Sequence, residues 1–309
     1  MFQSEVEQKF QTALDESRLL MLATQILFGF QFQTVFQDLF GSFTLTMRRV
    51  DAAAMLLVVV SIALLLAPAS QHRFVERGQI TGRIRTVVTR YIEFALLPFA
   101  VSLGLDVYLV FTVGYGPSLG LIVGAAIFVL AMMAWYIAEF AYRYWVLGKA
   151  PRVEKVGYHD TGILIRVHQL LTEARIALPG AQALLGFQLA VIMTKAFGLL
   201  PESSRIVHAV SLVAIAVSLV LLVAPAAVHR IVFDGDDTES LYRIGSNLVT
   251  AALFPLAVGM SGDVYVAIDR ILQDQNVAIA TAAGAFILLI SFWYLWPLVL
   301  RSRLRSAES

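Results

Sequence analysis

The stretch from Ala52 to Ala69 contains no charged side chain, and this constrains the fold more than any other feature of the sequence. A helix that crosses the core of a bilayer needs about 20 mostly apolar residues. Lipid offers the backbone no hydrogen-bond partners, so a helix is the expected form of such a segment. The whole chain agrees, with 59% hydrophobic and 15% charged residues, against about a quarter charged in soluble domains. The sequence therefore predicts an all-α integral membrane protein.

Seven further stretches are apolar and long enough to be spans, although glutamines interrupt the first and the fifth. The eight predicted spans are 19–40, 52–70, 88–112, 119–145, 176–199, 206–228, 246–267 and 278–300. Residues 1–18 precede them and repeat an apolar side chain every four residues, which is typical of an interfacial helix. A frayed tail is the alternative for this segment.

Charge and composition exclude several classes of function. The 23 basic and 22 acidic residues give a net charge of +1, which provides no basic surface for nucleic acid. The chain has no cysteine, so disulfides, thiolate metal sites and cysteine nucleophiles are excluded. No common catalytic motif is present. We therefore expect a protein that is not an enzyme and that has no cofactor and no metal.

The sequence contains an internal repeat, because the first half aligns with the second at a shift of 157 residues. The matching segments are Gln25–Gln31 with Gln182–Gln188, Ala67–Arg73 with Ala224–Arg230, and Asp106–Tyr108 with Asp263–Tyr265. We expect a first four-helix repeat at 1–146, a linker at 147–167 and a second repeat at 168–309. An even number of spans per repeat predicts two parallel repeats related by a pseudo-two-fold axis along the membrane normal.

Basic residues predict the orientation in the membrane. Eighteen of the 23 lie on the side that holds both termini, and five lie on the other side. Cytoplasmic loops carry an excess of lysine and arginine. We therefore expect a multi-pass protein of the bacterial inner membrane with both termini in the cytoplasm.

Three motifs occur in both halves: a Glu-x-Arg start, a Gln-x-x-x-Gly-Phe-Gln helix and an Ala-Pro-Ala-x-x-His-Arg helix end. They resemble an uncharacterised family of small bacterial membrane proteins with four predicted spans. Some members of that family carry an automatic label of sodium:proton antiporter. The resemblance covers both halves and implies a tandem duplication similar to a fused dimer of the family unit.

Asp106 and Asp263 are the first candidates for function, because both repeats carry an acid at this position. An ionisable group at membrane depth is costly and often functional. Each acid follows a helix proline, Pro98 or Pro255, which frees a backbone carbonyl. A carboxylate near such carbonyls can bind a proton or sodium. In the alternative interpretation the acids lie at the outer helix ends and simply contact water.

The glutamines Gln25, Gln31, Gln182 and Gln188 are also shared by the repeats. They line a central pathway in one interpretation and form ordinary interhelical hydrogen bonds in the other. A second shared set lies on the cytoplasmic side and forms either a proton-sensing cluster or structural salt bridges. This set is Glu16, Arg18, His72, Arg73, Glu173, Arg175, His229 and Arg230.

The segment Thr112–Gly116 spells the potassium-channel filter sequence. The second repeat lacks it, so we interpret it as a glycine-rich turn, with a filter-like loop as the alternative. Taken together, the sequence predicts a proton or small-cation transporter or channel with its pathway at the repeat interface. The alternative is a non-transporting scaffold or an accessory subunit of a larger complex. The expected partners are the lipid bilayer, a proton or sodium, and a homo-oligomer or larger membrane complex, but no nucleic acid.

Overall fold

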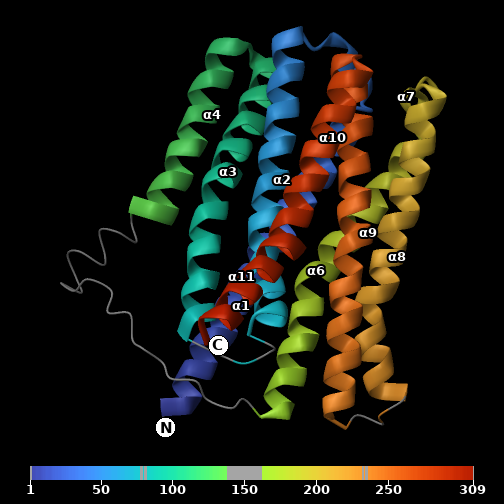
Figure 1. Ribbon diagram of the computed structural model, residues 1–309. Helices are drawn as coiled ribbons and strands as arrows, with labels where there is room; N and C mark the ends of the chain where they lie inside the picture. The colour runs from blue at the N-terminus through green and yellow to red at the C-terminus, as the bar shows by residue number, and fades with distance from the viewer. Residues whose placement is uncertain are drawn as a thin grey trace.

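The structure is a computed structural model, and it describes residues 2–76, 79, 82–137, 162–231, 233 and 236–308. All regular elements in these ranges are helices, so the predicted all-α fold is confirmed there. Figure 1 shows long helices side by side, with both ends of the chain toward the same end of the bundle.

The first half of the chain forms long helices joined by tight turns. They are α1 (Phe2–Thr34), the 3-10 helix η1 (Asp38–Ser42), α2 (Leu45–Phe74), α3 (Gly82–Tyr115), α4 (Pro117–Met132) and the π-helical turn η2 (Met133–Ile137). The hydroxyl of Thr44 caps α2 by accepting a hydrogen bond from the Met47 amide at 3.3 Å. Gly116, with φ of 98°, makes the turn between α3 and α4.

The second half repeats this order. Its elements are α6 (Ile163–Ile192), α7 (Lys195–Gly198), α8 (Glu202–Ile231), α9 (Glu239–Leu272), α10 (Gln275–Ile290), the π-helical turn η4 (Ser291–Leu295) and α11 (Trp296–Glu308). Thr238 caps α9 and Asp274 caps α10, each through a side-chain oxygen.

Within the described ranges, six helices are long and apolar enough to span a membrane. They cover Leu45–Phe74, Val87–Tyr115, Ile163–Ile192, Glu202–His229, Glu239–Leu272 and Gln275–Leu304. Two further apolar helices, Leu19–Thr34 and Pro117–Met132, are shorter. These helices indicate a membrane protein whose outer faces would contact the lipid bilayer.

Several predicted boundaries differ from the observed ones. The first predicted span runs to residue 40, but α1 ends at Thr34, because Phe36 and Phe40 turn back into the core with 2% exposure each. The fifth runs from 176 to 199, whereas α6 begins at Ile163 and ends at Ile192. There the hydroxyl of Thr194 caps the short helix α7. Residues 138–145 of the fourth predicted span lie outside the described residues.

The ends of the repeats also differ from expectation. The segment 1–18 was predicted as an interfacial helix or a frayed tail; from Phe2 onward the structure has one continuous helix, α1, that runs to Thr34. Most of the linker predicted at 147–167 lies outside the described residues, and its last part, from Ile163, already belongs to α6.

Hydroxyl groups join the helices of the first half at a proline. Pro98 has no amide proton and interrupts the hydrogen bonds of α3. Near this break, Ser61 of α2 donates to the carbonyl oxygen of Ala95 at 3.1 Å. Tyr136 of η2 donates to the carbonyl oxygen of Glu93. The segment of α3 before Pro98 is therefore held by both α2 and η2.

The second half makes the same bonds at equivalent positions. Pro255 interrupts α9, Ser218 of α8 donates to the carbonyl oxygen of Ala252 at 2.9 Å, and Tyr294 of η4 donates to that of Thr250 at 2.5 Å. These partners are the counterparts, 157 or 158 residues later, of those in the first half.

The halves meet along α1 and α6, but they are not packed alike. At this contact the rings of Phe30 and Phe187, which are repeat-equivalent, lie 4.8 Å apart. Trp293 of η4 crosses to the first half and donates from its indole nitrogen to the carbonyl oxygen of Ala63 in α2 at 3.1 Å. Its counterpart Trp135 instead stacks on Phe99 of its own half, at 5.6 Å. Figure 1 shows the resulting arrangement, with α10 in front of α2 and α9 and with α4 beside α3 at the edge.

Glycine allows α3 and α4 to approach closely. A side chain at Gly124 of α4 would place its Cβ 2.7 Å from the carbonyl oxygen of Gly104 and 2.8 Å from the Cβ of Tyr108. Backbone and Cβ atoms cannot rotate away, so the helices would have to separate.

We expect Gly124→Ala to lower the free energy of unfolding by about 1–3 kcal/mol, as overpacking typically does. The matched control is Gly284→Ala in α10, where a Cβ meets open space and helix propensity alone adds about 0.5–1 kcal/mol of stability. Thermal unfolding of both variants in detergent compares them. Equal melting temperatures would contradict the close packing of α3 on α4.

Candidate functional site

Asp263 lies deep inside the second half, with 1% of its surface exposed. Both of its carboxylate oxygens accept a hydrogen bond from the side-chain amide of Gln188 in α6, each at 2.8 Å. α9 continues for nine residues beyond it to Leu272, so the acid does not end its helix. No salt bridge joins it to a basic side chain among the described residues. An amide alone therefore holds this buried carboxyl group.

Asp106 has the equivalent partner in the first half. The side-chain amide of Gln31 in α1 donates to its two oxygens at 2.9 and 3.2 Å. The same nitrogen donates to the hydroxyl of Ser102 at 2.9 Å, which in turn donates to the carbonyl oxygen of Ala54 in α2 at 2.9 Å. Three helices are thus joined at this acid.

The acids and the helix prolines are separate features of the structure. Asp106 lies eight residues after Pro98, and Asp263 lies eight after Pro255, which is roughly 12 Å along a helix. Serine hydroxyls donate to the carbonyl oxygens three residues before the prolines, and tyrosine hydroxyls donate to those five residues before them. The acids bind glutamine instead of the backbone near the prolines.

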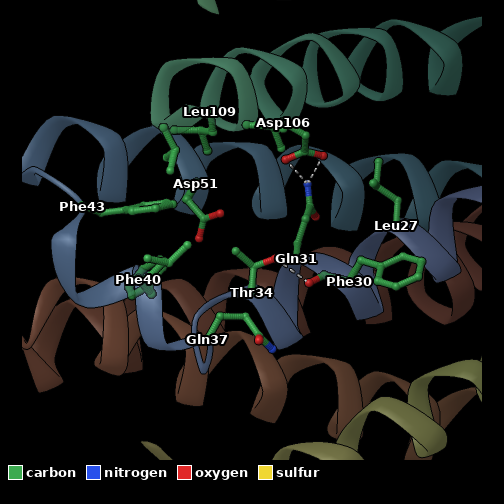
Figure 2. Close-up of a pocket in the computed structure, with 13 residues that line it drawn as sticks. Leu27, Phe30, Gln31, Thr34, Gln37, Phe40, Phe43, Asp51, Asp106 and Leu109 are labelled. Atoms are coloured by element: carbon green, nitrogen blue, oxygen red, sulfur yellow. Dashed lines mark hydrogen bonds between the residues drawn. The ribbon is translucent and has the colours of Figure 1, made fainter. Parts of the chain in front are cut away.

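A cavity of about 370 Å³ lies beside Asp106, between α1, η1, α2 and α3. Figure 2 shows a second acid, Asp51 of α2, turned into the same space. Asp51 is 2% exposed, and its Oδ2 has no hydrogen-bond partner in the part of the chain that is described. Asp51 was not among the residues predicted from the sequence, and its counterpart in the second half is not an acid. The signal was a single acid near the start of a long apolar helix.

His208 of α8 occupies the position equivalent to Asp51, 157 residues later. Its Nε2 donates to the carbonyl oxygen of Gln188 at 3.2 Å. Its ring stacks on Phe32 of the first half at 5.9 Å and meets the edge of Phe197 at 5.0 Å. The second half therefore has a packed imidazole where the first half has an acid beside a cavity.

The other two candidate glutamines differ from each other. Gln25 of α1 is completely buried against Gly180 of α6, and neither of its amide atoms has a hydrogen-bond partner among the described residues. Gln182, its repeat equivalent, is exposed. Only Gln25 is thus enclosed between the two halves.

Part of the predicted cytoplasmic set comes together across the two halves. Glu173 of α6 is 3% exposed, and its oxygens lie 2.6 Å from Nδ1 of His72 and 2.6 Å from Nη1 of Arg73, both at the end of α2. A buried carboxylate and guanidinium in direct contact form a charge-assisted hydrogen bond. This cluster fixes α2 of the first half to α6 of the second.

The remaining members of the set do not join this cluster. Arg175 is exposed, and His229 lies 3.4 Å from Asp237 in the turn before α9. The side chains of Glu16, Arg18 and Arg230 lie outside the described residues, so the equivalent contact between Glu16 and His229 is not described.

Two further sequence features have a plain structural place. Thr112–Tyr115 forms the last turn of α3, and the amide of Gly116 donates to the carbonyl oxygen of Thr112 at 3.0 Å. This carbonyl is used within the helix, unlike the carbonyls of a potassium filter, which face the ion. Within the described ranges, no three His, Asp or Glu side chains gather in a way that could hold a metal ion.

The family profile of DUF6328, described as a family of unknown function, matches residues 3–139 and 166–297. These segments make up most of the chain. The chain belongs to the DUF6328 family. The two matches are consistent with an uncharacterised family and with a possible repeat, and the DUF6328 description names no antiporter activity. No curated protein and no solved structure matches the chain.

We expect Glu173→Gln to lower the free energy of unfolding by about 3–5 kcal/mol, because it leaves Arg73 buried without a counter-charge. The control is Glu239→Gln, which breaks the more exposed pair with Arg166 and costs at most about 1 kcal/mol. Denaturant unfolding in detergent measures both. Similar losses for the two variants would show that the buried cluster does not hold the halves together.

Proposed function

We propose that this protein carries protons or small cations across a membrane, with Asp106 and Asp263 as the groups that bind them. The observation that supports this is the pair of equivalent contacts, in which each acid is held by a glutamine and by no basic side chain among the described residues. A buried carboxylate without a cationic partner is costly. Binding a proton or a cation removes that cost, which is what a carrier site requires.

The proposed architecture is two four-helix repeats that arose by gene duplication and cross the membrane eight times. The repeats are parallel and related by a pseudo-two-fold axis along the membrane normal. Equivalent hydrogen bonds support it: Gln31 with Asp106 and Gln188 with Asp263 are each 75 residues apart. The serine and tyrosine bonds beside the two prolines follow the same shift.

We propose the bacterial inner membrane as the location, with both termini in the cytoplasm. The support is the distribution of basic residues, eighteen against five. In this orientation the cluster of His72, Arg73 and Glu173 lies at the cytoplasmic side. A homo-oligomer or a larger membrane complex stays a prediction from the sequence.

The proposed pathway runs along α1 at the interface of the halves. Gln25 and Gln31 lie six residues apart on this helix, roughly 9 Å. Gln25 is enclosed between α1 and α6 without a described hydrogen-bond partner. Buried polar groups normally have a hydrogen-bond partner. A side-chain amide that has none among the described residues is well suited to contact water or a passing ion. Gln188 would serve Asp263 in the same way, whereas Gln182 is exposed and has no part in the pathway.

The test is proton and sodium flux into proteoliposomes under an imposed gradient. We expect the double variant Asp106→Asn and Asp263→Asn to reduce flux at least ten-fold, because an amide cannot take up a proton. The control is Asp269→Asn, which changes an acid that accepts a hydrogen bond from Ser204 at 2.5 Å near the end of α9. We expect this control to keep the flux of the unaltered protein.

Two results would contradict the proposal. Flux that survives the double substitution would reject Asp106 and Asp263 as carriers. Absence of flux for protons and sodium in the unaltered protein would favour the alternative, a scaffold or accessory subunit.

A further inference from the structure

The cavity beside Asp106 presents hydrogen-bond acceptors that have no donor. The Oδ2 atom of Asp51 and the Oε1 atom of Gln31 are buried and have no hydrogen-bond partner among the described residues. The nearby hydroxyls of Ser102 and Thr34 donate to the carbonyl oxygens of Ala54 and Phe30, so their protons are already used. A ligand that satisfies this cavity must supply a donor or a positive charge.

The two acids of the cavity also repel each other when both are ionised. Asp51 and Asp106 line the same cavity, and no salt bridge to either acid occurs in the described part of the chain. Arg48 is one helical turn from Asp51, but its guanidinium donates to the carbonyl oxygens of Phe43 and Gly41. A bound cation would relieve this repulsion.

The walls of the cavity suit an organic cation better than a bare metal ion. Sodium and calcium prefer a close shell of oxygen ligands, whereas Phe30, Phe40, Phe43, Leu109 and Val113 form much of this wall. Figure 2 shows the phenyl rings of Phe40 and Phe43 on the side of the cavity where Asp51 lies. The guanidinium of Arg48 already lies over the Phe40 ring, 5.6 Å from its centroid. Aromatic faces attract organic cations, and a volume of about 370 Å³ is in the range of pockets for small organic ligands.

The second half does not offer the same site. At the position of Asp51 it has His208, whose ring packs between Phe32 and Phe197. Of the two acids of the first-half site, only Asp106 has an acidic equivalent among the described residues of the second half. This equivalent is Asp263, and both of its oxygens are bonded to Gln188. The site with two acids therefore belongs to the first half alone.

We infer that the cavity of the first half binds a monovalent organic cation, an amine or quaternary ammonium with apolar or aromatic substituents, between Asp51 and Asp106. The carboxyl groups hold the positive charge, and the phenylalanine and aliphatic side chains contact the substituents. The idea that the protein exchanges this cation for protons rests on the carrier function proposed above. The binding of the cation does not.

The test is equilibrium binding of a fluorescent cation, 4-(4-dimethylaminostyryl)-N-methylpyridinium, to the full-length protein in lipid nanodiscs. The matched probe is the same molecule without the methyl group on its pyridine nitrogen. This probe is uncharged at pH 8. We expect the cation to bind at least ten-fold more tightly than the neutral probe. Sodium at the same concentration should not displace it.

Variants locate the site. We expect Asp51→Asn to weaken binding of the cation at least ten-fold, while Asp269→Asn binds as the unaltered protein does. Val113→Trp fills the cavity from α3 without altering either acid, and we expect it to abolish binding. It therefore tests the site independently if Asp51→Asn folds poorly. Melting temperatures identify any variant that is misfolded.

The possible outcomes separate this inference from the proposed function. No binding, equal binding of the neutral probe, displacement by sodium, or full binding by Val113→Trp would overturn the inference, whether or not protons are transported. Cation binding that depends on Asp51 in a protein without measurable flux would support the binding site and reject the carrier.

Discussion

Polar groups inside this bundle must find their hydrogen-bond partners within the protein, because lipid offers none. The structure meets this constraint with short-range pairs between neighbouring helices. Serine and tyrosine hydroxyls bind the carbonyl groups beside Pro98 and Pro255, and glutamine amides bind Asp106 and Asp263. The same bonds that satisfy buried groups also set which helices are neighbours. The packing of α1 on α3, and of α6 on α9, thus depends on the glutamine and the acid together.

The contacts between the halves are less regular than the contacts within them. Glu173 binds His72 and Arg73 across the interface, and Trp293 binds the backbone of Ala63. The counterpart of Trp293 packs within its own half. Apolar surface packs almost equally well against lipid and against protein, so it does not by itself specify such an interface. Directional bonds and a buried ion pair supply the specificity that apolar packing lacks.

The sequence predicted the helical fold and the position of most apolar helices, because long uncharged stretches leave few alternatives. It predicted the ends of α1 and α6 less well, since burial of Phe36 and Phe40 and capping by Thr194 depend on tertiary contacts. The acids Asp106 and Asp263 and the glutamines Gln31 and Gln188 were visible as repeated residues, but the pairing of each acid with its glutamine was not. Asp51 was not predicted, because its counterpart in the second half is a histidine, His208. Residues shared by the halves mark their common structure, whereas Asp51 lies at a position where the halves differ.

Those differences show what a repeat within one chain permits. Two identical subunits around a two-fold axis present the same side chain at equivalent positions. Here Asp51 is replaced by His208, and Gln25 is enclosed while Gln182 is exposed. One half keeps an open acidic cavity, and the other closes the equivalent region with an imidazole and an aromatic ring. The shared glutamine and acid pairs preserve the frame, so the unshared positions are free to give each half a separate chemical role.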